Sequence, residues 1–169
     1  QTRYKNFAAA NFNVKTYQEI FQINDVKISF YPAGHMLGSA MVLLEYNGTR
    51  YLYTGDYKLE ADETCEAVEL CQADVLITET TFANPEVNHP DASEEIEKLN
   101  RVKANIMLGA YALGKSQRLV RLINDRCPEK KILVHHGIMP FMHIYEQMGI
   151  NLGQYQVYDR KLMKQNLEG

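Results

Sequence analysis

An Asn-Gly pair at residues 47 and 48 is the feature that most restricts how this chain can fold. It stands between the runs AMVLLEY and TRYLYTGD, which are rich in Val, Leu and Tyr. Asn and Gly both tolerate the positive φ angles of a two-residue turn, so this pattern is a strong hairpin signal. The pattern predicts two antiparallel strands whose outer ends, near residues 40 and 54, lie at the same edge of a sheet.

Two glycine-rich loops are expected at that edge. His35 lies in PAGHMLGSA before the first strand, and Asp56 follows Thr54-Gly55 after the second. Glycine lets the backbone turn sharply at a strand end. A neutral imidazole is a common zinc ligand, and a carboxylate has two oxygens that can bridge two cations. We therefore predict that His35 and Asp56 are neighbours and candidate metal ligands, although either motif alone is also typical of an ordinary loop.

The rest of the chain predicts an α/β protein with two parts. VKISFYP and residues 75–78 are expected strands, the latter buried, and the first 25 residues are expected to hold a further strand pair. FANPEVNHPDAS is typical of a loop or domain boundary. Beyond it we expect a helix capped by Ser93, a helix in KSQRLVRLINDR, a strand in KKILVHHG and a helix in MPFMHIYEQMG. The predicted domains are residues 1–82 and 83–169.

Composition restricts the function only weakly. Hydrophobic residues make up 46% and charged residues 23% of the 169 residues, which is typical of a globular protein. No apolar run approaches the ~18 residues of a membrane span. The net charge of −3 gives no bulk support for nucleic-acid binding but is compatible with a local basic patch. Three cysteines without disulfide or C-x-x-C spacing predict reduced thiols in a cytoplasmic protein.

Two further segments carry chemistry. Glu79 follows the strand expected at 75–78 and is a candidate functional residue at a strand end. The alternative is that Glu79 is an ordinary cap or turn residue. GAYALGKS matches the letters of a phosphate-binding G-x-x-x-x-G-K-S loop, with Lys115 at the start of a helix. An ATPase would need a buried strand before this loop and an Asp at the end of a neighbouring strand, and no later strand ends in Asp. A helix start with a lysine still favours anion binding over an ATPase.

These motifs together resemble the metallo-β-lactamase fold, and specifically its β-CASP nuclease branch. PAGHMLGSAMVLLEYNGTRYLYTGDY is similar to the family's G-H-x-x-G-S-A and T-G-D metal motifs, and ITETTF to its first β-CASP motif. LGAYALGKSQRLVRLI and ILVHHGI resemble the bacterial ligase-associated DNA exonucleases and the mRNA 3′-end processing factor-like exonucleases. The resemblance implies part of an αββα sandwich in residues 1–82, followed by part of an α/β β-CASP domain in residues 83–169.

The resemblance also implies roles for individual residues. His35 would bind one zinc and Asp56 would bridge two zincs, which activate water and stabilise an in-line phosphodiester transition state. Glu79 would orient a histidine that acts as general acid. Lys115, Gln117 and Arg118 would hold backbone phosphates, with a solvated helix face as the alternative. The expected partner is DNA or RNA, with association to a DNA ligase or helicase in the ligase-associated branch and no membrane contact.

Other parts of the family pattern are absent from this sequence. The H-x-H-x-D-H motif, which supplies most ligands, and the later histidine motifs are missing, and His135-His136 matches none of them. The sequence therefore predicts a zinc-dependent nucleic-acid phosphodiesterase represented by an incomplete chain that holds zinc weakly. The alternative is a non-catalytic, metal-deficient scaffold or nucleic-acid-binding relative of the same fold. The sequence does not separate DNA from RNA or exonuclease from endonuclease.

Overall fold

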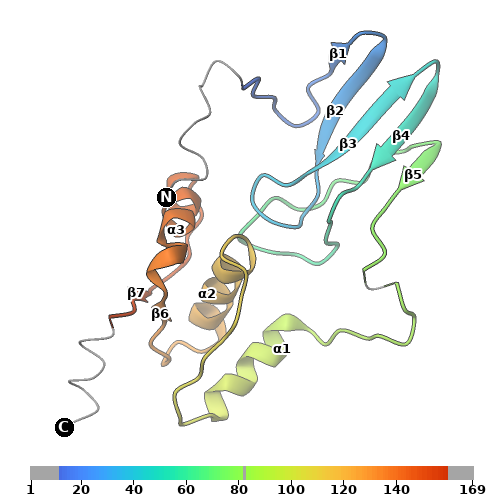
Figure 1. Cartoon of the computed structure of the whole chain (residues 1–169). Helices are drawn as coiled ribbons and strands as arrows, with labels where there is room; N and C mark the ends of the chain where they lie inside the picture. The colour runs from blue at the N-terminus through green and yellow to red at the C-terminus, as the bar shows by residue number, and fades with distance from the viewer. Residues whose placement is uncertain (1–11, 82, 160–169) are drawn as a thin grey trace.

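The computed structural model describes residues 12–81 and 83–159, and it has a mixed α/β architecture (Figure 1). Its first part is a five-stranded sheet in the order β1-β2-β3-β4-β5. The first four strands are antiparallel neighbours, and β5 pairs in parallel with β4. The strands are β1 (Phe21–Ile23), β2 (Val26–Pro32), β3 (Ala40–Tyr46), β4 (Thr49–Tyr53) and β5 (Val75–Ile77).

The predicted hairpin is confirmed. Tyr46 pairs with Thr49, so Asn47 and Gly48 form a two-residue turn between β3 and β4. Their φ angles are 49° and 78°, both positive, as a turn that follows the right-handed twist of the strands requires. The turn fixes the register, which places the loops before β3 and after β4 at the opposite end of the hairpin.

The second part is mainly helical and lies beside one end of the sheet (Figure 1). A short two-stranded parallel sheet of β6 and β7 completes it. The elements are α1 (Ala92–Glu97), η2 (Lys98–Arg101), α2 (Lys115–Arg126), β6 (Leu133–Val134), η3 (His136–Ile138), α3 (Met139–Gln147) and β7 (Gln156–Val157). The helices expected in 115–126 and 139–149 are therefore present, and Gly149, with φ of 85°, follows the end of α3. No helix among residues 12–81 and 83–159 has the length and apolar character that a membrane crossing needs.

Each part has its own hydrophobic core. Ala33, Met41, Leu43 and Leu52 are buried on one face of the sheet. In the helical part, the buried side chains of α2, α3 and β6 pack together with Leu152, and Tyr145 and Met142 are almost completely buried. Leu37, from the loop before β3, packs against this second core. A residue of the sheet part thus belongs to the packing of the helical part.

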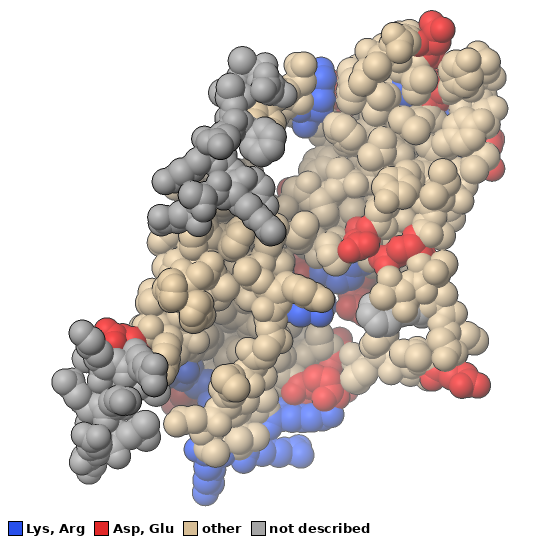
Figure 2. Space-filling model, in the orientation of Figure 1, with Lys and Arg blue, Asp and Glu red and all other residues tan. Residues whose placement is uncertain are grey.

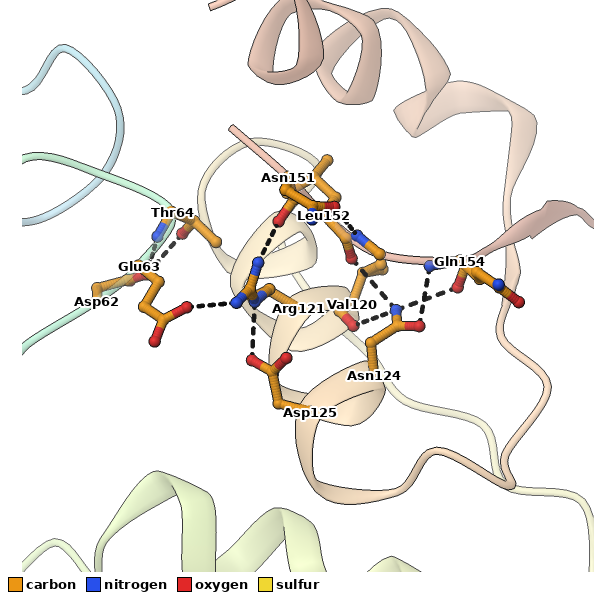
Figure 3. Close-up of polar contacts among 11 residues, drawn as sticks. Asp62, Glu63, Thr64, Val120, Arg121, Asn124, Asp125, Asn151, Leu152 and Gln154 are labelled. Atoms are coloured by element: carbon orange, nitrogen blue, oxygen red, sulfur yellow. Dashed lines mark hydrogen bonds and ion pairs between the residues drawn. The ribbon is translucent and has the colours of Figure 1, made fainter. Parts of the chain in front are cut away.

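A network of ion pairs also joins the two parts. Arg121 of α2 donates to Glu63 at 2.5 Å, to Asp125 at 2.8 Å and to the Asn151 carbonyl at 2.8 Å (Figure 3). Arg118 lies 3.5 Å from Asp62, which is also paired with Lys58. A cleft of about 510 Å³ lies between residues 60–63 and the helices α1 and α2. We call the contacts of Arg118 and Arg121 with residues 60–63 the joint.

Two local predictions were wrong. Residues 75–77 do form a strand, but it is exposed rather than buried, with Leu76 61% exposed, because β5 has a single pairing partner, β4, at the edge of the sheet. The cap of α1 is Asp91 rather than Ser93, since the Asp91 carboxylate accepts from the amides of residues 93 and 94.

The strand pair expected in the first 25 residues is present only in part. Phe21–Ile23 forms β1 and pairs with β2, whereas residues 12–20 contain no strand. Residues 1–11 of that prediction lie outside the described part of the chain. The division into domains at residues 82 and 83 stays a prediction, although the sheet of β1–β5 lies before that point and every helix in the described ranges lies after it.

The cysteines are free thiols, as expected. Cys127 is buried in the helical part and donates to the Ile96 carbonyl at 3.2 Å. Burial, together with the nearby charge of Asp62, raises the pKa of Cys65 to about 11. A thiol with so high a pKa is almost entirely protonated at neutral pH and is a poor nucleophile and metal ligand.

Candidate functional site

His35 and Asp56 meet at one edge of the sheet, as the hairpin pattern predicted. His35 follows β2 and Asp56 follows β4, and the distance from His35 Nε2 to Asp56 Oδ2 is 3.9 Å. The side chains are 43% and 71% exposed, so both project from the protein surface. Antiparallel pairing brings the end of β2 and the start of β3 to the same edge as the end of β4. The two side chains are therefore accessible to a ligand from solvent.

Glu79 lies next to this pair and holds the Asp56 segment. Its carboxylate accepts a hydrogen bond from the backbone amide of Tyr57 at 3.0 Å. The hydrogen bond from Thr81, then that from Tyr57, and more weakly the charge of His35, lower the pKa of Glu79. Glu79 is therefore an anion that fixes the backbone directly after Asp56. Its expected role of orienting a catalytic histidine stays a prediction.

The His35 loop, which we define as residues 33–39, is a tightly bonded turn. Ser39 Oγ accepts hydrogen bonds from the amides of His35 and Met36, both at 3.1 Å. The Gly38 amide donates to Glu66 at 3.0 Å. Gly34 has φ of 69°, and a side chain there would place its Cβ 2.5 Å from the Lys58 carbonyl oxygen. These contacts restrain the backbone of the loop, and the His35 side chain projects from it.

The pair fits as part of a metal site. Two ligands of a tetrahedral zinc are each about 2.0–2.1 Å from the ion and so about 3.4 Å apart. The observed 3.9 Å comes close to that spacing, and both exposed side chains can rotate. Among the described residues, no group of three or more His, Cys, Asp and Glu side chains is placed to hold a metal ion. His35 and Asp56 therefore supply two ligands where a catalytic zinc normally has three from protein.

The predicted phosphate-binding residues lie in different environments. Lys115 begins α2 with an exposed side chain. Arg118 is partly buried and faces Glu60 at 3.3 Å and Asp62 at 3.5 Å, within the joint. Gln117 is completely buried, and its amide nitrogen donates to the Ala112 carbonyl. The geometry gives Gln117 a place in the core, because the first turn of α2 presents that position to the helical part, so only Lys115 and Arg118 remain accessible for phosphate binding.

Basic side chains are unevenly distributed on the surface. Figure 2 shows them gathered at the lower end of the drawn face, in the region of α1 and α2, with acidic side chains beside them. Arg118, Arg121 and Arg126 all have carboxylate partners at 3.5 Å or less. Negative phosphates that approach α2 must therefore compete with carboxylates already in place.

Sequence reasoning missed the groups that support the site. Ser39, Glu66 and Tyr145 bond the amides of the His35 loop, and the Tyr57 amide binds Glu79. Ser39 had a local signal, because a hydroxyl a few residues after a turn often binds its backbone amides. Glu66 and Tyr145 are 28 and 108 residues from their partners, so no local pattern could have indicated them.

Comparison with known proteins matches this chain to nucleic-acid processing proteins. It is 31% identical over 145 residues to "Probable DNA ligase" of Opitutus terrae, covering 80% of the chain and 14% of that protein. It is 28% identical over 151 residues to "Endoribonuclease YSH1" of Eremothecium gossypii, covering 84% of the chain and 19% of that protein. It is 32% identical over 128 residues to "RNase J-like protein" of Methanocaldococcus jannaschii, covering 70% and 30%.

No family model matches the chain. With its mixed α/β fold and these relatives, the chain belongs to the β-CASP nuclease family of the metallo-β-lactamase fold, as its motifs predicted. The chain spans 14%, 19% and 30% of the lengths of these three relatives.

Proposed function

We propose that this chain is part of a zinc-dependent phosphodiesterase that cleaves nucleic acid. The observation that carries the proposal is the convergence of His35, Asp56 and Glu79 at one sheet edge, with His35 and Asp56 3.9 Å apart. The relatives named for ribonuclease activity support nucleic acid as the substrate class. More specifically, we propose exonuclease action of the type that processes RNA 3′ ends. The expected compartment is the cytoplasm.

Each residue has a distinct part in this proposal. His35 would hold one ion through a ring nitrogen, and the Asp56 carboxylate would help to hold the pair of ions. Such a pair of ions, when bound, lowers the pKa of water and stabilises the charge of an in-line displacement. Glu79 keeps the Asp56 carboxylate in place through the Tyr57 amide. Lys115 and Arg118 attract backbone phosphates without reading sequence.

The second candidate is a metal-deficient scaffold that binds nucleic acid without cleaving it. It is favoured by the described ligand set, which contains two residues rather than three. The two candidates differ in the product of the whole gene. A nuclease encodes H-x-H-x-D-H upstream of residue 1, and a scaffold does not.

The test is zinc content by elemental analysis, measured on this chain and on the full-length gene product. We expect two zinc ions per full-length molecule and weak, substoichiometric zinc in this chain, because two-metal sites need ligands beyond His35 and Asp56. Cleavage of single-stranded DNA and RNA is assayed on the same preparations. We expect Asp56→Asn in the full-length protein to remove cleavage, since the variant loses a negative charge that would hold the ions.

The matched control is His143→Gln, which alters an exposed histidine on α3 that pairs with Glu146. It should leave zinc content and cleavage unchanged. Absence of zinc from the full-length protein would establish the scaffold instead. Tight binding of two zinc ions by this chain alone would show that the missing ligands were wrongly identified.

A further inference from the structure

The His35 loop is anchored to the helical part as well as to the sheet. The Leu37 amide donates to the hydroxyl of Tyr145, on α3, at 3.3 Å. Tyr145 is 1% exposed, so its hydroxyl reaches the loop through the core rather than through solvent. The two residues are 108 positions apart in sequence. A side chain of helix α3 therefore accepts a hydrogen bond from the backbone amide two residues after His35, the candidate metal ligand.

Packing accompanies this hydrogen bond. The Leu37 side chain packs against the core that contains Tyr145, Val120 and Met142. Met36, the residue directly after His35, packs against Gly114. A Cβ added to Gly114 would lie 3.0 Å from Met36 Cβ. Both residues that follow His35 are thus held by the helical part, one from α3 and one from the start of α2.

The sheet part supplies the remaining anchors. Ser39 binds the amides of His35 and Met36, and Glu66 binds that of Gly38. With Leu37 bonded to Tyr145, every backbone amide from His35 to Gly38 has a partner. The side chain of His35, in contrast, is 43% exposed. The anchors from both parts therefore act on the backbone and leave the imidazole available.

We propose that Tyr145 is a positioning residue for the metal centre, which holds the His35 loop in its ligand-presenting conformation and so makes metal affinity depend on the docking of the helical part. The inference rests on the proposed function, because it gives His35 the role of ligand. A hydrogen bond from a neighbouring residue that orients a metal ligand typically changes metal affinity by about 10- to 100-fold. Tyr145 acts one step further away, through Leu37, so a smaller effect of about three- to tenfold is expected, which is what one ordinary hydrogen bond supplies.

The test compares Tyr145→Phe with Tyr155→Phe. Both changes remove one hydroxyl from the helical part, but the Tyr155 hydroxyl donates to Glu146 at 2.6 Å, whereas the Tyr145 hydroxyl accepts from the Leu37 amide. Zinc is titrated into each chain under conditions where the chain is fully folded, with the His35 ring signals followed by NMR. Amide hydrogen exchange of Leu37 is measured on the same samples without metal.

We expect Tyr145→Phe to weaken zinc binding about three- to tenfold and to speed exchange at Leu37 by a similar factor. Tyr155→Phe should change both by less than about twofold. Gly114→Ala, which presses on Met36 from the other anchor, should weaken zinc binding in the same direction. It serves as the second variant if Tyr145→Phe does not fold.

Two results separate this inference from the proposed function. Equal zinc affinity and equal Leu37 exchange in Tyr145→Phe and Tyr155→Phe would overturn the positioning role, even where Tyr145→Phe lowers the unfolding midpoint. A wild-type chain whose His35 signals do not respond to zinc would contradict His35 as a ligand and, with it, the positioning of a metal centre. In that case, faster Leu37 exchange in Tyr145→Phe would show a structural anchor alone.

Discussion

Two glycine-containing loops look alike in sequence but differ in how the fold holds them. The His35 loop is bonded at each amide from His35 to Gly38, by groups from both parts of the molecule. The second loop, residues 109–114 before α2, is called the Gly109 loop. Its carbonyls at residues 111 to 114 accept hydrogen bonds from the first turn of the helix that follows it. Tyr111 within it is 79% exposed.

The difference shows that glycine content identifies where a chain turns and not how firmly the turn is held. Gly34 meets the Lys58 backbone, whereas nothing lies within 4 Å of a Cβ added to Gly109. A rigid loop suits a metal ligand, which must be held near one geometry. A loop with few anchors suits contact with a flexible polymer such as nucleic acid, and phosphate binding by the Lys115 segment stays a proposal.

The largest expected effect comes from Gly34→Ala. The positive φ costs a non-glycine residue about 1–2 kcal/mol, and the clash with the Lys58 carbonyl adds about 1–3 kcal/mol. We expect the variant to lose about 3 kcal/mol of unfolding free energy in urea denaturation.

Gly38→Ala is the matched control within the same loop. Gly38 has φ of 76° but nothing within 4 Å of an added Cβ, so only the conformational cost of about 1–2 kcal/mol applies. Equal losses in the two variants would mean that the close approach of the loop to Lys58 has no energetic weight.

A smaller effect is expected from Asp62→Asn, which weakens the joint that holds α2 and its preceding loop near the sheet. Asp62 is 5% exposed and bonded to Lys58, Thr64 and Arg118. Removal of its charge leaves two cations partly buried, and we expect a loss of about 2 kcal/mol, below the cost for a fully buried pair. Urea unfolding at pH 7 measures it.

The pH dependence of stability tests the same residue. Burial alone would raise the pKa of Asp62, but hydrogen bonds from Lys58 and Thr64 outweigh it and lower the pKa. Because the folded pKa lies below the unfolded value of about 3.9, the stabilisation is complete above pH ~4 and is lost as pH falls through the folded pKa. In Asp62→Asn, this part of the loss of unfolding free energy at acid pH should be absent.

Glu63→Gln is expected to have a smaller effect on the joint. The Glu63 side chain is 71% exposed, so the substitution should change the unfolding free energy by at most about 1 kcal/mol.

The smallest effect is expected from Gly109→Ala. Its φ is not positive, and an added Cβ meets nothing within 4 Å, so alanine restricts the unfolded chain without strain in the folded one. We expect a gain of about 0.5 kcal/mol, measured as a shift in the urea midpoint. A loss above about 1 kcal/mol would show that the Gly109 loop is as closely held as the His35 loop, and the comparison of the two loops would fail.

The sequence predicted the parts of the fold that depend on local chemistry. Asn47-Gly48 determined a hairpin and its register, and the apolar spacing in 115–126 determined α2, because both signals act within a few residues. The proximity of His35 and Asp56 followed from that register. Each of these conclusions needed only residues adjacent along the chain or across one turn.

Predictions that depended on distant neighbours were less successful. The letters VLI at residues 75–77 are those of a buried strand, yet burial depends on what covers the sheet, and β5 is an exposed edge. Gln117 has the letters of a polar helix surface, yet its position on α2 faces Met142 of α3. Tyr145 gave no signal at all, because its partner, Leu37, is 108 residues away.

The hairpin turn offers a place to attach a probe. Strands β3 and β4 run from the His35 and Asp56 loops to Asn47-Gly48, and the seven residues of β3 span about 20 Å. Nothing lies within 4 Å of an added Cβ at Gly48. A fluorophore or a short tag inserted between residues 48 and 49 would thus be remote from the site and exposed to solvent. It could report substrate docking by energy transfer while the metal ligands and their anchors keep their native surroundings.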